Sequence, residues 1–272
     1  MFKPMFKQTA AGMVILLATA VSASGHDYWL QPQRFFLAKG ESTAVKLFVG
    51  DHFVSETDRP VQSKKTVDFQ LISRNEMTDL RVTKDNGART SAFISPKNLG
   101  SHLVVMQRDW SHIEIEAAKF NKYLEHEGLS RILELRRKAG EEKTVGRERY
   151  RRYLKALVQV GKESDETFKR KIGHRLEILP HSHPSATTIG DDISLSILFE
   201  GKPLINAQVA AYNRRDDQTK THEARTDEQG RVQFTLDHSG LWLIRLVHMQ
   251  RCDDDPEFEW ESFWAAYSFQ LK

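Results

Sequence analysis

Period-two alternation of apolar and polar residues recurs along most of the chain and limits the folds open to it. The alternation runs through segments 67–71, 193–199 and 232–236, with turn residues between such segments. Alternation of this kind indicates β-strands that bury one face. No helical segments alternate with these strands, which favours antiparallel sandwiches over a parallel α/β sheet. We therefore predict a mainly β protein with two β-sandwich domains.

The strand pattern is interrupted at residues 116–174, where we predict a helical insert. Its first apolar residues recur at helical spacing, and Gly128 is expected to break that helix. A second helix is predicted over 147–160, because apolar residues there recur at i, i+3, i+4, i+7 and i+8. The N-terminal sandwich is then predicted at 26–115 and the C-terminal sandwich at 175–272. The second of these contains the turn motifs GKPL at 201–204 and TDEQGRV at 226–232, and with them it resembles transthyretin-like or carboxypeptidase-regulatory sandwiches. The resemblance implies two Ig-like or transthyretin-like β-sandwich domains.

The first 25 residues indicate an export signal. Lys3 and Lys7 precede an uncharged, largely apolar run at 9–23, which is too short to span a membrane comfortably. Small residues allow cleavage after Ala23 or after Gly25. We expect an exported protein, periplasmic if the organism is Gram-negative and extracellular otherwise.

Charge and cysteine content exclude several classes of protein. The chain has 40 Lys and Arg against 37 Asp and Glu, which argues against a nucleic-acid binder. A single cysteine, Cys252, excludes an internal disulfide and Cys-rich zinc sites. Ten Lys or Arg lie between residues 131 and 155, which predicts either a solvated face or a docking surface for an acidic partner or anionic membrane.

Sequence motifs of enzymes are scarce, so we expect a protein that binds rather than catalyses. The sequence has no nucleophile elbow, no phosphate-binding glycine loop and no His-Glu-x-x-His helix. It has 11 histidines, and neutral imidazole is a common ligand of zinc, copper and nickel. His181 and His183 would face one side of an extended segment, where they either share an ion or belong to a rigid linker.

His26 is the strongest candidate metal ligand in the sequence, and its role depends on the cleavage site. Cleavage after Gly25 would give His26 a free α-amine, so that its amine and imidazole could chelate one Cu(II) or Ni(II) ion. Cleavage after Ala23 would leave two residues in front and make His26 an ordinary residue at the start of a strand. His52 and His248 lie at the ends of predicted strands, where side chains project into loops that often form sites.

Six short motifs follow one another along the chain. They are HDYWLQP at 26–32, VGDHF at 49–53, KF at 119–120 with YLEHEGL at 123–129, GRERY at 146–150 with KAL at 155–157, LWLI at 241–244 with VHM at 247–249, and WESFWA at 260–265. Together they resemble an uncharacterised exported family related to the periplasmic components of nickel and cobalt uptake. The resemblance covers nearly the whole chain after the signal and implies two sandwiches, a helical insert and a role in transition-metal binding.

The resemblance also implies which residues hold the metal. The matching positions able to ligate an ion are His26, His52 and His248, with Glu261 as a carboxylate ligand. The ion would be nickel, cobalt or copper, delivered to a component of a membrane transporter. Two other functions stay open: a non-catalytic sandwich module that binds a protein or glycan, and a copper-dependent oxidative enzyme that uses the N-terminal His. The oligomeric state stays open as well.

Overall fold

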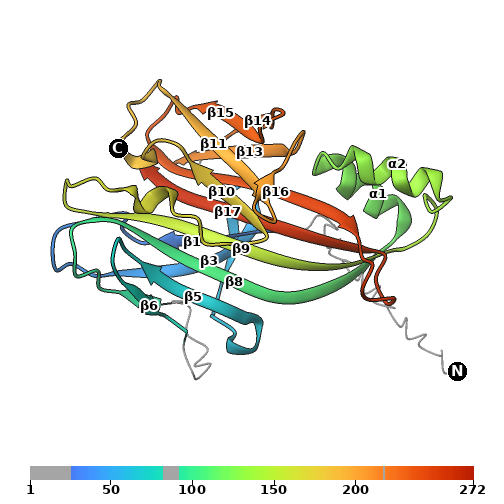
Figure 1. The fold of residues 1–272 in the computed structure, drawn as a ribbon, viewed down its shortest axis with the longest axis horizontal. Helices are drawn as coiled ribbons and strands as arrows, with labels where there is room; N and C mark the ends of the chain where they lie inside the picture. Colours follow the sequence, from blue (N-terminus) through green and yellow to red (C-terminus); the bar gives the residue numbers. More distant parts are fainter. Residues whose placement is uncertain (1–25, 82–91, 217) are drawn as a thin grey trace, which may run out of the picture.

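The computed structural model describes residues 26–81, 92–216 and 218–272. Three β-sheets are stacked in layers, and two α-helices lie at one end of the long central strands (Figure 1). This architecture confirms the predicted mainly β sandwich class. The predicted signal at residues 1–25 lies outside the described residues. In the part of the chain that the structure describes, no helix has the length and apolar character needed to cross a membrane.

The central sheet has nine strands in the order β14-β13-β16-β17-β9-β8-β5-β6, with β2 paired to β9. Its strands are β2 (Phe36–Leu37), β5 (Thr66–Ile72), β6 (Met77–Asp79), β8 (Gly100–Ile115), β9 (Gly146–Val160), β13 (Gln208–Arg215), β14 (Gln218–Arg225), β16 (Gly240–Arg251) and β17 (Trp260–Leu271). β17 pairs with β9 in parallel. This pair joins the N-terminal and C-terminal parts of the chain in one sheet.

A four-stranded sheet covers each face of the central sheet. The first covering sheet contains β1 (Asp27–Pro32), β3 (Thr43–Asp51), β4 (Val54–Arg59) and β7 (Ala92–Ile94), and the second contains β10 (Leu176–Pro180), β11 (Asp192–Phe199), β12 (Lys202–Pro203) and β15 (Arg231–Thr235). Three short 3-10 helices lie in the connections: η1 (Ser63–Lys65), η2 (Glu166–Lys169) and η3 (Pro184–Ala186). Fully buried Trp29 lies in the core under the first covering sheet, and fully buried Leu195 in the core under the second.

The helix predicted at 147–160 is wrong, because these residues form β9 in the middle of the central sheet. Tyr153 and Leu157 point into the core under the second covering sheet, whereas Leu154 and Val158 point into the core under the first. A strand that is buried on both faces is apolar at consecutive positions. Apolar pairs at 153–154 and 157–158 therefore satisfy helical spacing as well, and periodicity alone does not separate the two structures.

The central sheet takes strands from all three predicted segments of the chain. β8 comes from the predicted N-terminal sandwich, β9 from the predicted helical insert, and β16 and β17 from the predicted C-terminal sandwich. Each covering sheet, by contrast, comes from one predicted sandwich only. The two sandwiches thus share their middle layer, and the division of the chain into separate domains stays a prediction.

The first part of the predicted insert forms two amphipathic helices, as expected. They are α1 (Ala117–His126) and α2 (Ser130–Lys138). The Glu116 side chain caps α1 by accepting hydrogen bonds from two backbone N–H groups. Gly128 has a φ of 66°, which lets the chain turn between the helices. Phe120 of α1 lies in a third apolar core with Trp264 of β17, so the helices cover the end of the central sheet.

Glu148 of β9 is buried beneath α1, with an exposed fraction of only 2%. Tyr123 and Ser262 donate hydrogen bonds to its carboxylate. No Lys or Arg among the described residues forms an ion pair with it. Burial raises the pKa of Glu148 to about 7, because these two hydroxyls do not offset the lost hydration of a carboxylate.

The raised pKa of Glu148 predicts that part of the stability is lost as the pH rises. The unfolded chain releases this proton near 4.5 and the folded protein near 7, so the folded state is progressively destabilised between these values. The free energy of unfolding should fall by roughly 3 kcal/mol over this pH range. This fall should be absent in Glu148→Gln, because glutamine does not titrate. Urea denaturation of both proteins from pH 4.5 to 8 measures it, and parallel stability curves would show that Glu148 titrates normally.

Candidate metal centre

Arg245 of β16 joins the start of β1 to the end of α1. Its guanidinium donates to Asp27 Oδ1 at 2.6 Å and to Glu127 Oε1 at 3.1 Å, and all three residues are buried. Burial alone would lower the pKa of Arg245, but the two carboxylates raise it above its usual range. Two histidines adjoin these carboxylates in the chain, His26 and His126. Arg245 therefore fixes the backbone positions from which both imidazoles project.

Three metal-ligating side chains meet at the edge of the first covering sheet: His26, Asp51 and Glu56. The pairing of β1 with β3 sets Asp27 opposite Gly50, which brings His26 beside Asp51. His26 Nε2 lies 3.1 Å from Glu56 Oε2, and one donor atom from each of the three residues lies within 4.8 Å of the others. Donor atoms that share one ion lie about 3 to 4.4 Å apart, so small side-chain movements would let these three bind the same ion.

A tight turn between β3 and β4 sets the positions of the two carboxylates. Its central residues, His52 and Phe53, have φ values of 50° and 62°. This left-handed conformation is costly for residues other than glycine and persists where surrounding contacts hold it. Here Arg214 Nη1 donates to the backbone oxygen of Phe53 at 2.9 Å. Gly50 is needed at the start of the turn, since a Cβ there would lie 1.9 Å from the backbone oxygen of Val54.

His52, a predicted ligand, is not one of the three clustered donors. Its exposed ring instead contacts His126 of α1 and Tyr212 of β13, with ring centroids 5.6 and 6.0 Å away. His52 nevertheless follows Asp51 directly in the chain. The structure therefore places it beside the cluster, in a separate contact with α1.

His248, another predicted ligand, lies on the opposite face of the central sheet from His26. Successive residues of a strand face opposite sides, and Arg245 of the same strand faces β1, where it contacts Asp27. His248, three residues further on, faces the second covering sheet, and its ring centroid lies 4.3 Å from that of Phe199. Burial lowers the pKa of His248 to about 4. One ion cannot bind both His26 and His248.

Glu261 lies in a different cluster, with Cys252 and Asp254. Arg149 already neutralises these acids, since it donates to Glu261 Oε2 at 2.6 Å and to Asp254 Oδ1 at 2.5 Å. Burial raises the pKa of the Cys252 thiol, which disfavours the thiolate that a metal requires. A metal ion would have to displace an arginine from this cluster, so it is the weaker of the two candidates.

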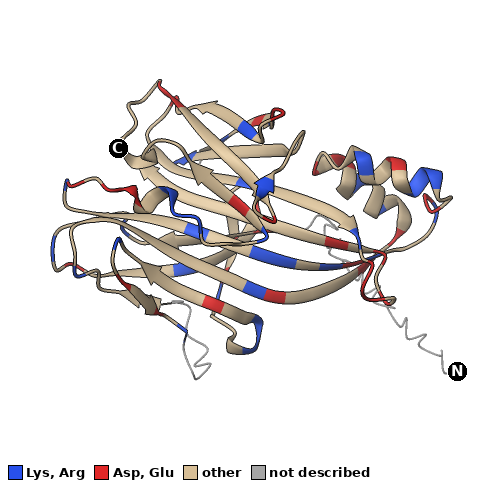
Figure 2. Cartoon of the chain, viewed as in Figure 1, with Lys and Arg blue, Asp and Glu red and all other residues tan. Residues whose placement is uncertain are grey.

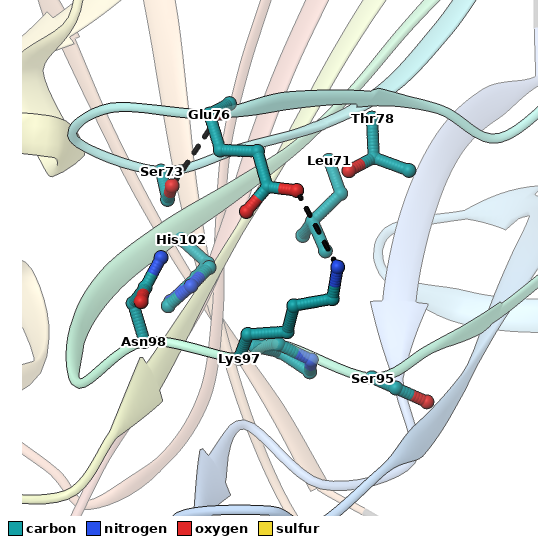
Figure 3. Close-up of a pocket in the computed structure, with 9 residues that line it drawn as sticks. Leu71, Ser73, Glu76, Thr78, Ser95, Lys97, Asn98 and His102 are labelled. Atoms are coloured by element: carbon teal, nitrogen blue, oxygen red, sulfur yellow. Dashed lines mark hydrogen bonds and ion pairs between the residues drawn. The ribbon is translucent and has the colours of Figure 1, made fainter.

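A small cavity lies beside His102, between the turn that follows β5 and the loop that precedes β8 (Figure 3). Glu76 and Lys97 face each other across it as an ion pair of 3.8 Å. Its volume is about 30 Å³, which accommodates about one water molecule. The cavity is therefore too small to hold a ligand larger than a water molecule.

Most of the basic residues between positions 131 and 155 have partners within the protein. Lys155 forms a buried ion pair with Glu177 at 2.7 Å, and Arg147 pairs with Glu259 at 2.6 Å. Figure 2 shows acidic residues among the basic ones along the long central strands. Five of the ten basic residues form ion pairs within the protein, and the docking surface considered from the sequence stays a prediction.

Sequence reasoning missed Asp51 and Glu56 as candidate ligands, although it singled out the motif at 49–53 that contains Asp51. A two-residue turn at 52–53 would have placed the two carboxylates on adjoining strands. The pairing of β1 with β3 is a contact between distant segments, and no local signal in the sequence specifies it.

Layered β-sheets and an accessible cluster of one imidazole and two carboxylates define this molecule as a β-sandwich protein with a candidate cation site at a sheet edge. The chain belongs to the family described as Domain of unknown function (DUF4198), which matches residues 23–250. That description names no metal, substrate or activity. Membership of an uncharacterised family is thus confirmed, and the link to nickel and cobalt uptake stays a prediction.

Three solved structures have distant likenesses to this chain. A variant of Salmonella alpha-2-macroglobulin is 8% identical with a TM-score of 0.22, over 90% of this chain and 15% of that chain. Escherichia coli alpha-2-macroglobulin activated by porcine elastase is 10% identical with a TM-score of 0.23, over 89% and 23%. Dimeric latent PorU from Porphyromonas gingivalis is 9% identical with a TM-score of 0.20, over 94% and 21%. The chain spans less than a quarter of each of these, and curated proteins give no match.

Replacing Arg245 by Met should destabilise the protein strongly. The change would leave the carboxylates of Asp27 and Glu127 buried without their shared cation, at a cost of about 3 to 5 kcal/mol. The thermal midpoint should fall by roughly 6 to 20 °C for a chain of this size. Arg137→Met is the matched control, because its pair with Glu142 is exposed and contributes at most about 1 kcal/mol. Equal losses in the two variants would contradict the role given to Arg245.

Proposed function

We propose that the protein binds a divalent transition-metal ion, nickel, cobalt or copper, and delivers it to a membrane uptake system. The ion is cargo in this proposal, and the protein performs no chemistry on it. The observation that carries the proposal is the cluster of His26, Asp51 and Glu56, whose donor atoms lie within 4.8 Å of one another.

The chemistry of the donors supports this choice of cargo. Imidazole nitrogen suits copper, nickel and zinc, and carboxylate oxygens extend the range to harder ions. Two carboxylates also balance the charge of a divalent ion, so the loaded site would be close to neutral. Raw affinity at such a site rises from cobalt through nickel to copper, and selection among them would come from geometry and metal supply.

The positions of the donors support reversible capture. His26 directly precedes β1, Asp51 ends β3 and Glu56 lies in β4, and none of the three residues is buried. The backbone oxygen of His26 accepts a hydrogen bond from Arg152 Nη2 at 3.3 Å, which helps to hold the start of β1. Donors that are already held lose less conformational freedom on binding. An accessible site also lets the ion leave, as delivery to a transporter requires.

The α-amine of His26 would add a further nitrogen donor if the exported chain begins at this residue. Amine and imidazole of one residue would then chelate the ion together, beside the two carboxylates. This arrangement favours Cu(II) and Ni(II), which prefer nitrogen-rich sites. Intact-mass analysis of the exported protein decides whether this donor exists.

Calorimetric titration with Ni(II) of the chain that begins at His26 tests the proposal. We expect His26→Ala to weaken binding by at least about tenfold, because it removes the imidazole. Glu56→Gln should also weaken binding, because it removes a charged oxygen donor. Saturation at about 100 times Kd should stabilise the protein by about 2.7 kcal/mol and raise its melting midpoint by roughly 5 to 10 °C.

His112→Ala is the matched control for these variants, because it removes an exposed imidazole on β8 outside the cluster. The affinity of His112→Ala for Ni(II) should equal that of the unaltered chain. A chain that begins at Ser24 isolates the contribution of the α-amine. Unchanged melting with nickel, cobalt, copper and zinc would contradict the proposal, as would full affinity in His26→Ala.

A further inference from the structure

A second pair of imidazoles lies next to the proposed site, and neither belongs to its three donors. His52 is in the turn between β3 and β4, and His126 is the last residue of α1. Their ring centroids are 5.6 Å apart and their planes are inclined at 80°. Both residues are exposed, so an ion from solvent can reach the rings.

The separation of the two rings fits a shared metal ion. The centroid of an imidazole lies about 3.2 Å from a metal bound to either ring nitrogen, so two rings that share an ion have centroids within about 6.4 Å of each other. The observed 5.6 Å lies inside this limit. Rotation of the side chains would suffice to aim both nitrogens at one point.

His126 also has the second partner that metal-binding histidines commonly have. Its Nδ1 lies 3.4 Å from Glu127 Oε1, and Arg245 holds that carboxylate in turn. A carboxylate on one ring nitrogen fixes the tautomer and directs the other nitrogen to a metal. Nε2 of His126 is therefore the nitrogen available to an ion.

Side chains of strand β13 contact both histidines or the residue next to them. Tyr212 packs against the ring of His52, and Arg214 donates to the backbone oxygen of the next residue. Gln208 Nε2 lies 3.5 Å from the backbone oxygen of His126, to which it donates. One rigid strand thus supports two imidazoles that are far apart in the sequence, which is the arrangement a preorganised site needs.

We propose that His52 and His126 bind a second divalent transition-metal ion through their imidazole nitrogens, with water completing its coordination. This inference goes beyond the proposed function, because it concerns another ion and does not need the first site to be filled. Its two nitrogen donors suit copper, nickel and zinc. The bound ion would link α1 directly to the turn that carries Asp51.

Titration calorimetry with Ni(II) measures how many ions bind to each protein molecule. The chain that begins at His26 should bind about two per molecule, and His126→Ala should bind about one. His52→Asn should also bind about one, and asparagine tolerates the left-handed conformation of this turn, so the fold is kept. His181→Ala, which removes an exposed imidazole elsewhere, should keep both ions. With Zn(II), the ring nitrogen signals of His52 and His126 should shift together in NMR spectra of the unaltered protein.

The outcomes separate this inference from the proposed function. If one ion binds and is lost only in His26→Ala, this inference fails and the proposed function stands. If one ion is lost in His126→Ala and His52→Asn but kept in His26→Ala, this inference stands and the proposed site fails. The NMR experiment uses the unaltered protein. If the ring nitrogen signals of His52 and His126 do not shift when the protein is saturated with Zn(II), the inference is overturned.

Discussion

The buried contact of Arg245 with Asp27 and Glu127 joins the segments that directly follow two of the proposed metal ligands. It links the central sheet to the first covering sheet and to α1 in one place. A buried charge is tolerated only with a charged, hydrogen-bonded partner, and here one guanidinium serves two carboxylates. Because the neighbours of these carboxylates are His26 and His126, the same contact that stabilises the fold also sets where the two imidazoles lie.

The two clusters of ligand-type residues differ in the partners of their glutamates, Glu261 and Glu56. Arg149 already neutralises the acids around Cys252 and Glu261, so a metal ion would gain little by replacing it. In the other cluster the partner of Glu56 is His26, whose imidazole is itself a metal-ligand type. This difference between the partners of Glu56 and Glu261 favours the cluster that contains His26 as the candidate metal site.

The sequence predicts the fold class well and the arrangement of the site only in part. Alternating segments such as 193–199 predict the strands, and the stripe that includes Phe120 predicts the helices, because one buried face leaves a clear period. Both faces of β9 are buried, so its apolar residues also fit helical spacing and the sequence wrongly predicts a helix there. His26 is a candidate in the sequence because it follows the predicted signal. Its neighbours Asp51 and Glu56 depend on the pairing of β1 with β3, and the separation of His248 depends on which face of β16 it occupies.

Anomalous diffraction from crystals of the chain that begins at His26, soaked in nickel and measured at the nickel absorption edge, tests the central claim most directly. The account predicts an anomalous peak about 2.0 to 2.2 Å from His26 Nε2 and from carboxylate oxygens of Asp51 and Glu56. Occupied density beside His248 or Glu261, with none at His26, would contradict it.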